Sequence, residues 1–313
     1  MKKFLDAKII YNTKNMSKAE WLEKRRCGIG GSDASSIVNM SPFKSRASVY
    51  IDKLHSNNYE ECESESFRME LGNKLEDFVA REFMLRTGKK VRNVNGILRN
   101  DKYPFAIANI DRYVFGEKAI LECKVTNSFQ KKEWEKQVPI YYQIQCLHYM
   151  AVTGASCCYV ATLIGNEDFV IHKLERDEEL INYLMEEEEK FWKEYILGDK
   201  VPIPDGSEDY SRFLKNKYKN PKNESIILFM KEEKINGYDE VLKLIKELDL
   251  EKKYIEQVIQ NEMGDYEVAF VGDRKITWKN QSRSSFDSKR FRSDFPEIAS
   301  EYVKTTTSRM FRM

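Results

Sequence analysis

Two acidic residues and a lysine flank a predicted turn in the segment FAIANIDRYVFGEKAILECKV, residues 105–125. Gly116-Glu117 is a glycine-led pair of the kind that closes a tight β-hairpin. Counting outward from this turn places Asp111 opposite Glu122, with Cβ atoms about 5 Å apart. Lys124 projects from the same face, because strand side chains alternate between faces. Asp111, Glu122 and Lys124 are therefore expected to converge.

Two adjacent carboxylates and an amine suit metal-dependent hydrolysis of a phosphodiester. Carboxylates this close repel each other unless a cation lies between them, and Mg²⁺ prefers oxygen ligands and takes only one or two carboxylates. Lys124 is placed to orient or deprotonate the attacking water, or to stabilise charge developing on a phosphate. The alternative is an ion-pair ladder on a solvated sheet face, which would have no catalytic role.

A glycine-rich loop nearer the N-terminus is suited to hold a phosphate group. The segment RRCGIGGSD, residues 25–33, frees the backbone for tight turns, and Ser32 is expected to cap the helix that follows. Helix N-terminal N–H groups, the Ser32 hydroxyl and Arg25 would together form a phosphate pocket. The alternative is that the glycines only separate two helices.

A third acidic residue is predicted to point inward from a helix over residues 67–86. Helical spacing puts Glu76 on a small, apolar face with Ala80 and Phe83. A carboxylate directed into a core needs a partner, and a metal ion is one candidate. Pairing with basic neighbours on the helix surface is the alternative.

A later helix, beginning at Pro139, presents a polar and aromatic stripe to the sheet. Tyr142, Gln145 and Tyr149 fall on one face of this helix. Core tyrosines with satisfied hydroxyl groups are the default explanation of such a stripe. Gln143 competes with Gln145 for the position facing the site, because the register of the helix is not fixed by one sequence.

These segments together resemble a known nuclease family. Asp111 followed across a hairpin by Glu122-x-Lys124 is similar to the PD-(D/E)XK core. GIGGSDAS, GNKLEDFVAREF, LECKV and YYQIQCLHYMAVTG resemble, in order, the successive blocks of the YqaJ-type viral recombinases, relatives of the phage λ exonuclease, over roughly residues 20 to 165. The resemblance implies an α/β fold with a mixed central sheet flanked by helices, in the core order helix, three strands, helix, strand.

The resemblance also implies roles for individual residues. Glu76, Asp111, Glu122 and the backbone carbonyl of Cys123 would hold Mg²⁺, or Mn²⁺ in its place. Lys124 would activate the attacking water, and Gln145 of a Gln-x-x-x-Tyr motif would orient the site. The 5′-terminal phosphate of DNA would be bound by Arg25 and Ser32, with Tyr149 as a further DNA contact.

The implied function is a metal-dependent double-stranded DNA exonuclease, acting 5′ to 3′, that makes single-stranded DNA for phage-type recombination. The implied partners are DNA ends, a single-strand annealing protein and further copies of the chain. One alternative is a structure- or site-directed endonuclease of the same fold. Another is a non-cleaving DNA-binding recombination mediator, which the presence of Asp111, Glu122 and Lys124 disfavours. The residues alone leave polarity, processivity and oligomeric state open.

The chain is predicted to divide into a nuclease domain, residues 1–200, and an accessory module, residues 201–313, at a Pro- and Gly-containing segment. The module is expected to hold an amphipathic helix over 237–263, folded into a helical hairpin or paired between subunits, and a β-hairpin turning at Gly272-Asp273. The tail from Lys279 carries eight Lys or Arg against four acids, interleaved with Phe. It is either a DNA contact or an amphipathic cap.

Composition limits the remaining possibilities. Lys+Arg 52 against Asp+Glu 51 leaves a net charge of +1, so local basic patches must hold any nucleic acid. No apolar run approaches a membrane span and no secretory leader is apparent, which predicts a cytoplasmic protein without membrane contact. The six cysteines lack metal-binding spacing and are expected to be free thiols. The three histidines look isolated, and the glutamate-rich helix over 177–196 is expected to present a solvated face.

Overall fold

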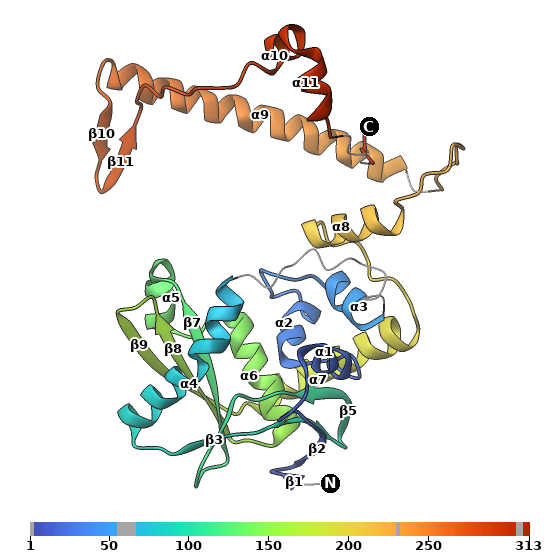
Figure 1. Cartoon of the computed structure of the whole chain (residues 1–313), viewed down its shortest axis with the longest axis vertical. Helices are drawn as coiled ribbons and strands as arrows, with labels where there is room; N and C mark the ends of the chain where they lie inside the picture. Colours follow the sequence, from blue (N-terminus) through green and yellow to red (C-terminus); the bar gives the residue numbers. More distant parts are fainter. Residues whose placement is uncertain (1–2, 55–66, 230–231, 305–308) are drawn as a thin grey trace. The chain divides into compact units, whose positions relative to one another are not determined.

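The computed structural model describes residues 3–54, 67–229, 232–304 and 309–313 (Figure 1). The acidic connection around residues 57–65, with Cys62, lies outside the described residues. The chain forms two compact units, Met1–Lys219 and Asn220–Met313. The first unit extends past the boundary predicted after residue 200.

The first unit is longer than predicted because helix α8 (Glu208–Lys217) packs on helix α3 (Arg46–Leu54). The rings of Tyr50 and Phe213 meet edge to face with centroids 6.3 Å apart. Asp209 accepts a hydrogen bond of 3.2 Å from the Ser45 backbone N–H.

A five-stranded mixed sheet forms the centre of the first unit. Its strands, in spatial order, are β3 (Val91–Asn93), β6 (Arg112–Val114), β7 (Ala119–Thr126), β8 (Cys157–Ile164) and β9 (Asp168–Glu175). The β7–β8 pair is parallel and the other neighbours are antiparallel. A parallel pair needs a crossover connection, which the next helices supply.

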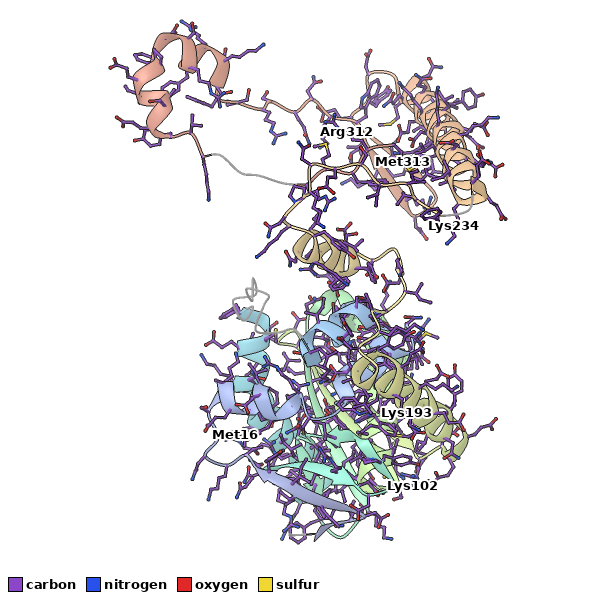
Figure 2. All side chains as sticks on the ribbon, turned by 90° about the vertical axis from the view of Figure 1, so that its right-hand side faces the viewer. Met16, Lys102, Lys193, Lys234, Arg312 and Met313 are labelled. Atoms are coloured by element: carbon purple, nitrogen blue, oxygen red, sulfur yellow. The ribbon has the colours of Figure 1, made fainter. Side chains whose placement is uncertain are left out.

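Helices cover both faces of this sheet. Helix α4 (Phe67–Thr87) lies on one face, where Val79, Ala80 and Phe83 pack against Leu121 of β7. Helix α6 (Ile140–Thr153), preceded by α5 (Lys131–Lys136), contacts β8 on the side where Ile120 is buried. Side chains fill the space between these layers (Figure 2). The predicted α/β fold, with its helix, three strands, helix and strand, is confirmed, and β4 and β5 are inserted into it.

A second, four-stranded antiparallel sheet was not predicted. Its order is β1 (Lys3–Phe4), β2 (Ala7–Asn12), β4 (Gly96–Asn100) and β5 (Tyr103–Ala108). The apolar run before the hairpin therefore does not form one continuous strand. Residues 105–108 pair in this second sheet, and the chain crosses to the central sheet at residues 109–111. The N-terminal helices α1 (Lys18–Arg25) and α2 (Gly31–Ile37) follow β2, and Ile29 between them bridges to Ala106 of β5.

The glutamate-rich helix α7 (Glu178–Phe191), continued by the π-helix η3 (Trp192–Leu197), is not solvated on every side. Glu188 is fully buried, and its carboxylate lies 2.8 Å from Nδ1 of His148. The other ring nitrogen of His148 donates to the Ile107 carbonyl at 2.9 Å. The prediction of a fully solvated glutamate face was wrong because helical spacing turns this one glutamate toward a buried histidine.

The second unit contains a single long helix, α9 (Glu232–Met263). The predicted β-hairpin is present as β10 (Val268–Val271) and β11 (Arg274–Thr277). Helix α9 runs unbroken for 32 residues, and within the second unit its apolar Val241, Leu248 and Ile255 are each at least half exposed. Two short helices, α10 (Ser288–Asp294) and α11 (Pro296–Glu301), follow in the basic tail. In the part of the chain that the structure describes, no helix is both long and apolar enough to span a bilayer.

The His148–Glu188 pair predicts that stability falls as pH rises. Burial alone would lower the pKa of His148, but the charge and hydrogen bond of Glu188, together with the Ile107 carbonyl and the Asp33 charge, raise this pKa above 6.5. Burial also raises the pKa of Glu188. The folded protein thus holds protons that the unfolded chain releases, so the free energy of unfolding should decrease as pH increases above 6.5 through the folded-state pKa of His148.

Thermal unfolding at about pH 6 and about pH 8.5 measures this effect, since the window brackets an ordinary histidine. E188Q should remove the decrease, because a neutral amide no longer holds a proton on the buried imidazole. An equal pH dependence in E188Q and the wild type would contradict the assignment.

Candidate active site

The β6–β7 hairpin has the register predicted from its turn. Arg112 lies opposite Leu121, so the next position outward sets Asp111, one residue before β6, against Glu122. The turn uses Gly116 at φ 80°, a left-handed conformation that glycine adopts without strain.

Glu122 is a buried carboxylate with partners on two elements. It is 4% exposed. Its Oε1 accepts hydrogen bonds from Lys124 Nζ and from Gln145 Nε2, each at 2.8 Å. Its Oε2 is also buried but has no hydrogen-bond partner among the described residues. The predicted alternative, an ion-pair ladder on a solvated face, is wrong because this face of β7 is covered by α6.

Asp111 lies where negative charge is crowded. Its Oδ2 accepts the backbone N–H of Cys123 at 2.8 Å. Burial, then the charges of Glu122 and Glu76, raise the pKa of Asp111 well above its usual range, and Lys124 only partly offsets them. The carboxylate is therefore held in a position that favours a proton or a cation beside it.

Lys124 is a protonated ammonium group in this arrangement. Burial alone would lower its pKa, but the charge of Glu122 raises it. Nζ also donates to Gln145 Oε1 at 3.3 Å and lies 4.4 Å from the centre of the Tyr142 ring. Held this way, Lys124 can donate hydrogen bonds and stabilise negative charge, whereas it is poorly suited to take up a proton.

The Glu76 side chain is 34% exposed, and its partner is Arg112, a residue that the sequence patterns did not single out. Arg112, whose side chain is 6% exposed, forms a salt bridge with Glu76 and a second one of 2.6 Å with Asp77. The same guanidinium donates to the backbone carbonyl of Asp111 at 2.7 Å. Arg112 follows Asp111 directly, so its side chain lies on the opposite face of the sheet, toward α4. The alternation of strand side chains could have predicted this placement.

The donors present fit a hard divalent cation held by two carboxylates. In the described ranges, no three His, Cys, Asp or Glu side chains form a metal-binding group. Mg²⁺ requires only one or two carboxylates and completes its shell with water and phosphate oxygens. The unpartnered Glu122 Oε2 and the raised pKa of Asp111 are both features that such a cation would relieve. Burial and then Asp111 raise the pKa of the Cys123 thiol, so Cys123 can offer its carbonyl oxygen but not a thiolate.

Gln145, rather than Gln143, faces the site. Gln145 Nε2 donates to Glu122 and also to the hydroxyl of Tyr149 at 3.0 Å. Gln143 instead donates to the Val138 carbonyl at 2.6 Å. Of the two glutamines, Gln145 is therefore the one that contacts Glu122.

Arg25 and Ser32 meet as predicted, although Ser32 is not a helix cap. Helix α2 begins at Gly31 after the N-cap Gly30, so the Ser32 hydroxyl is free to accept a 2.7 Å hydrogen bond from Arg25. The guanidinium lies 4.6 Å from the centre of the Trp21 ring. Among the residues the structure describes, no carboxylate forms a salt bridge with Arg25, which leaves its charge available to an anion.

Tyr149 joins the two parts of the candidate site. A Cβ atom on Gly31 would lie 2.5 Å from the Tyr149 ring, so only glycine fits here without a shift of the ring. The hydroxyl of the same Tyr149 contacts Gln145, which holds Glu122. The glycine loop with Arg25 therefore adjoins the carboxylate centre through one side chain.

Replacing Asp111 by Asn should stabilise the metal-free protein at neutral pH, by on the order of 1 kcal/mol. Asparagine keeps an oxygen acceptor for the Cys123 N–H but removes a charge that burial and Glu122 disfavour. Urea unfolding in EDTA measures the change. E117Q is the control, because Lys89 lowers the pKa of Glu117 and its charge is favourable. A D111N variant less stable than the wild type would argue against charge crowding.

Comparisons with known proteins identify the family of the chain. The YqaJ-like viral recombinase domain matches residues 20–156. The uncharacterized protein YqaJ of Bacillus subtilis (strain 168) is 38% identical over 310 residues, 97% of each chain.

Two solved structures are also similar to the chain. An alkaline exonuclease from Laribacter hongkongensis gives a TM-score of 0.49 at 21% identity, over 58% of this chain and 94% of that one. A phage related exonuclease from Haemophilus somnus 129PT gives a TM-score of 0.44 at 15% identity, over 57% of this chain and 100% of that one. Because the relationship to YqaJ spans both sequences almost end to end, the chain belongs to the YqaJ-like viral recombinase family.

Proposed function

We propose that this protein is a metal-dependent double-stranded DNA exonuclease that degrades one strand 5′ to 3′ and leaves single-stranded DNA for recombination. The observation that carries the proposal is the position of Glu122. This carboxylate is buried in the central sheet opposite Asp111 and is held by Lys124 and Gln145, and one of its oxygens has no partner in the part of the chain that the structure describes. Family membership supports a role in recombination.

The carboxylate centre would hold Mg²⁺, or Mn²⁺, through Asp111, Glu122 and the carbonyl oxygen of Cys123. When bound, the cation would offset charge on the scissile phosphate and make water a better nucleophile. Lys124 donates hydrogen bonds to the attacking water or to a phosphate oxygen. Gln145 holds both Glu122 and Lys124 in place, so their geometry is fixed before DNA binds.

The pocket formed by Arg25 and Ser32 would bind the 5′-terminal phosphate. The Arg25 guanidinium, which has no salt bridge to a carboxylate in the described ranges, and the Ser32 hydroxyl are both suited to phosphate oxygens. Tyr149 lies between this pocket and the carboxylate centre, and so would contact the DNA end as it enters. Single-stranded product of this kind is what a single-strand annealing protein would take over.

Replacing Glu122 or Lys124 by Ala should abolish or strongly reduce digestion of linear duplex DNA. Loss of Lys124 should cost about 10²- to 10³-fold in rate, the usual contribution of a positioned hydrogen-bond donor that stabilises developing negative charge. DNA binding, measured by fluorescence anisotropy in EDTA, should change little. The matched control is E117A, in the turn of the same hairpin. Undiminished digestion by E122A or K124A would remove that residue from the site.

The choice of substrate separates an exonuclease from an endonuclease. Linear duplex should be digested with Mg²⁺ and not with EDTA, while covalently closed circular DNA should stay intact. Nicking or linearisation of the circle would instead support an endonuclease of the same fold. Binding without digestion of either substrate would support a recombination mediator.

A further inference from the structure

A buried ion pair lies directly beneath the glycine loop and has no part in the chemistry described above. Lys53 Nζ of α3 lies 2.8 Å from Asp33 Oδ2 of α2, and the two side chains are only 1% and 5% exposed. A more distant contact of 3.5 Å joins Lys53 to Asp52, which is half exposed. Burying two charges costs free energy, and such pairs are often no more stabilising than apolar residues of the same size. Stability alone therefore does not account for this pair.

The pair connects three segments that surround the predicted phosphate pocket. Asp33 Oδ2 accepts the backbone N–H of Gly30 at 3.0 Å, which fixes the loop just before Ser32. Lys53 Nζ donates to the backbone carbonyl of Arg25 at 3.3 Å, at the last residue of α1. One ion pair therefore holds the backbone on both sides of the Arg25–Ser32 contact.

The charges of this group leave the pocket positive. Burial would raise the pKa of Asp33, but the charges of Lys53 and Arg25, together with hydrogen bonds from Lys53 and the Gly30 N–H, keep this pKa well below its usual range. Asp33 is thus ionised and balances one of the two nearby cations. Since Lys53 is inaccessible and faces Asp33, the charge left to meet a phosphate is that of Arg25.

We propose that Lys53 is a positioning residue for recognition of DNA ends: through Asp33 and the Arg25 carbonyl it sets the geometry of Arg25 and Ser32, and so determines the preference for 5′-phosphorylated over 5′-hydroxyl ends. Lys53 does not touch the DNA. The inference rests on the proposed exonuclease function and adds the residue that determines which ends are accepted.

The test compares K53M and K53R with the wild-type full chain on linear duplexes that carry either a 5′-phosphate or a 5′-hydroxyl. K53M should lower the preference for phosphorylated ends about 10- to 100-fold, because small misplacements of binding groups have effects of this size. For phosphorylated ends, KM should rise while kcat changes little. K53R keeps the charge and should restore most of the preference. K89M, which breaks the salt bridge of Lys89 with Glu117, is the matched control and should not change it.

A double variant, D33N/K53M, separates positioning from folding. Removing both charges should recover the thermal stability lost in K53M, because no buried charge is left without a partner, yet the end preference should stay low. Recovery of the preference together with stability would overturn the proposal. An unchanged preference in a folded K53M would also overturn it.

Binding measurements separate this inference from the proposed function. Anisotropy in EDTA with the same two duplexes reports end recognition without cleavage. If the wild type digests nothing but binds phosphorylated ends more tightly, and K53M loses that difference, the positioning role stands and the nuclease proposal fails. If the wild type digests both ends equally and binds both ends equally, the nuclease proposal stands and the positioning role fails.

Discussion

The rest of the structure depends on a carboxylate buried inside the central sheet. Glu122 lies in β7 with a strand on each side and α6 above it, where an ionised group needs partners. Lys124 comes from the same strand and Gln145 from α6. Both contacts require a fixed distance between β7 and α6 and a fixed rotation of α6 about its axis. The parallel β7–β8 crossover fixes that arrangement. The packing of α6 on the central sheet and the geometry of the candidate site thus both follow from the need of buried Glu122 for partners.

Other buried carboxylates near α6 also have charged partners. Buried charged pairs join Asp33 of α2 to Lys53 of α3, and Glu188 of α7 to His148 of α6. Asp33 is close enough to affect the pKa of His148, so the two pairs share one environment. Apolar contacts could hold these elements together, but hydrogen-bonded charges fix the relative orientation of the elements more strictly. The first unit therefore uses ion pairs where backbone position matters.

The sequence was informative where the physical rule is local. Turn chemistry and strand alternation predicted the opposition of Asp111 and Glu122, because a hairpin register follows from its turn. It was uninformative where partners come from far along the chain. Nothing within a few residues of Glu76 identifies Arg112 as its partner, and helical spacing alone could not say that Glu188 meets a histidine. The additional sheet was missed because its strands come from two separate segments.

The packing of α8 on α3 sets the smallest fragment of this chain that can be expected to fold independently. Tyr50 and Phe213 bury each other across this contact, and Asp209 binds the start of α3. A chain shortened to residue 200 would uncover the helix that also bears Lys53. Ending at Lys219 keeps that helix covered, so dissection of the two units should cut after it.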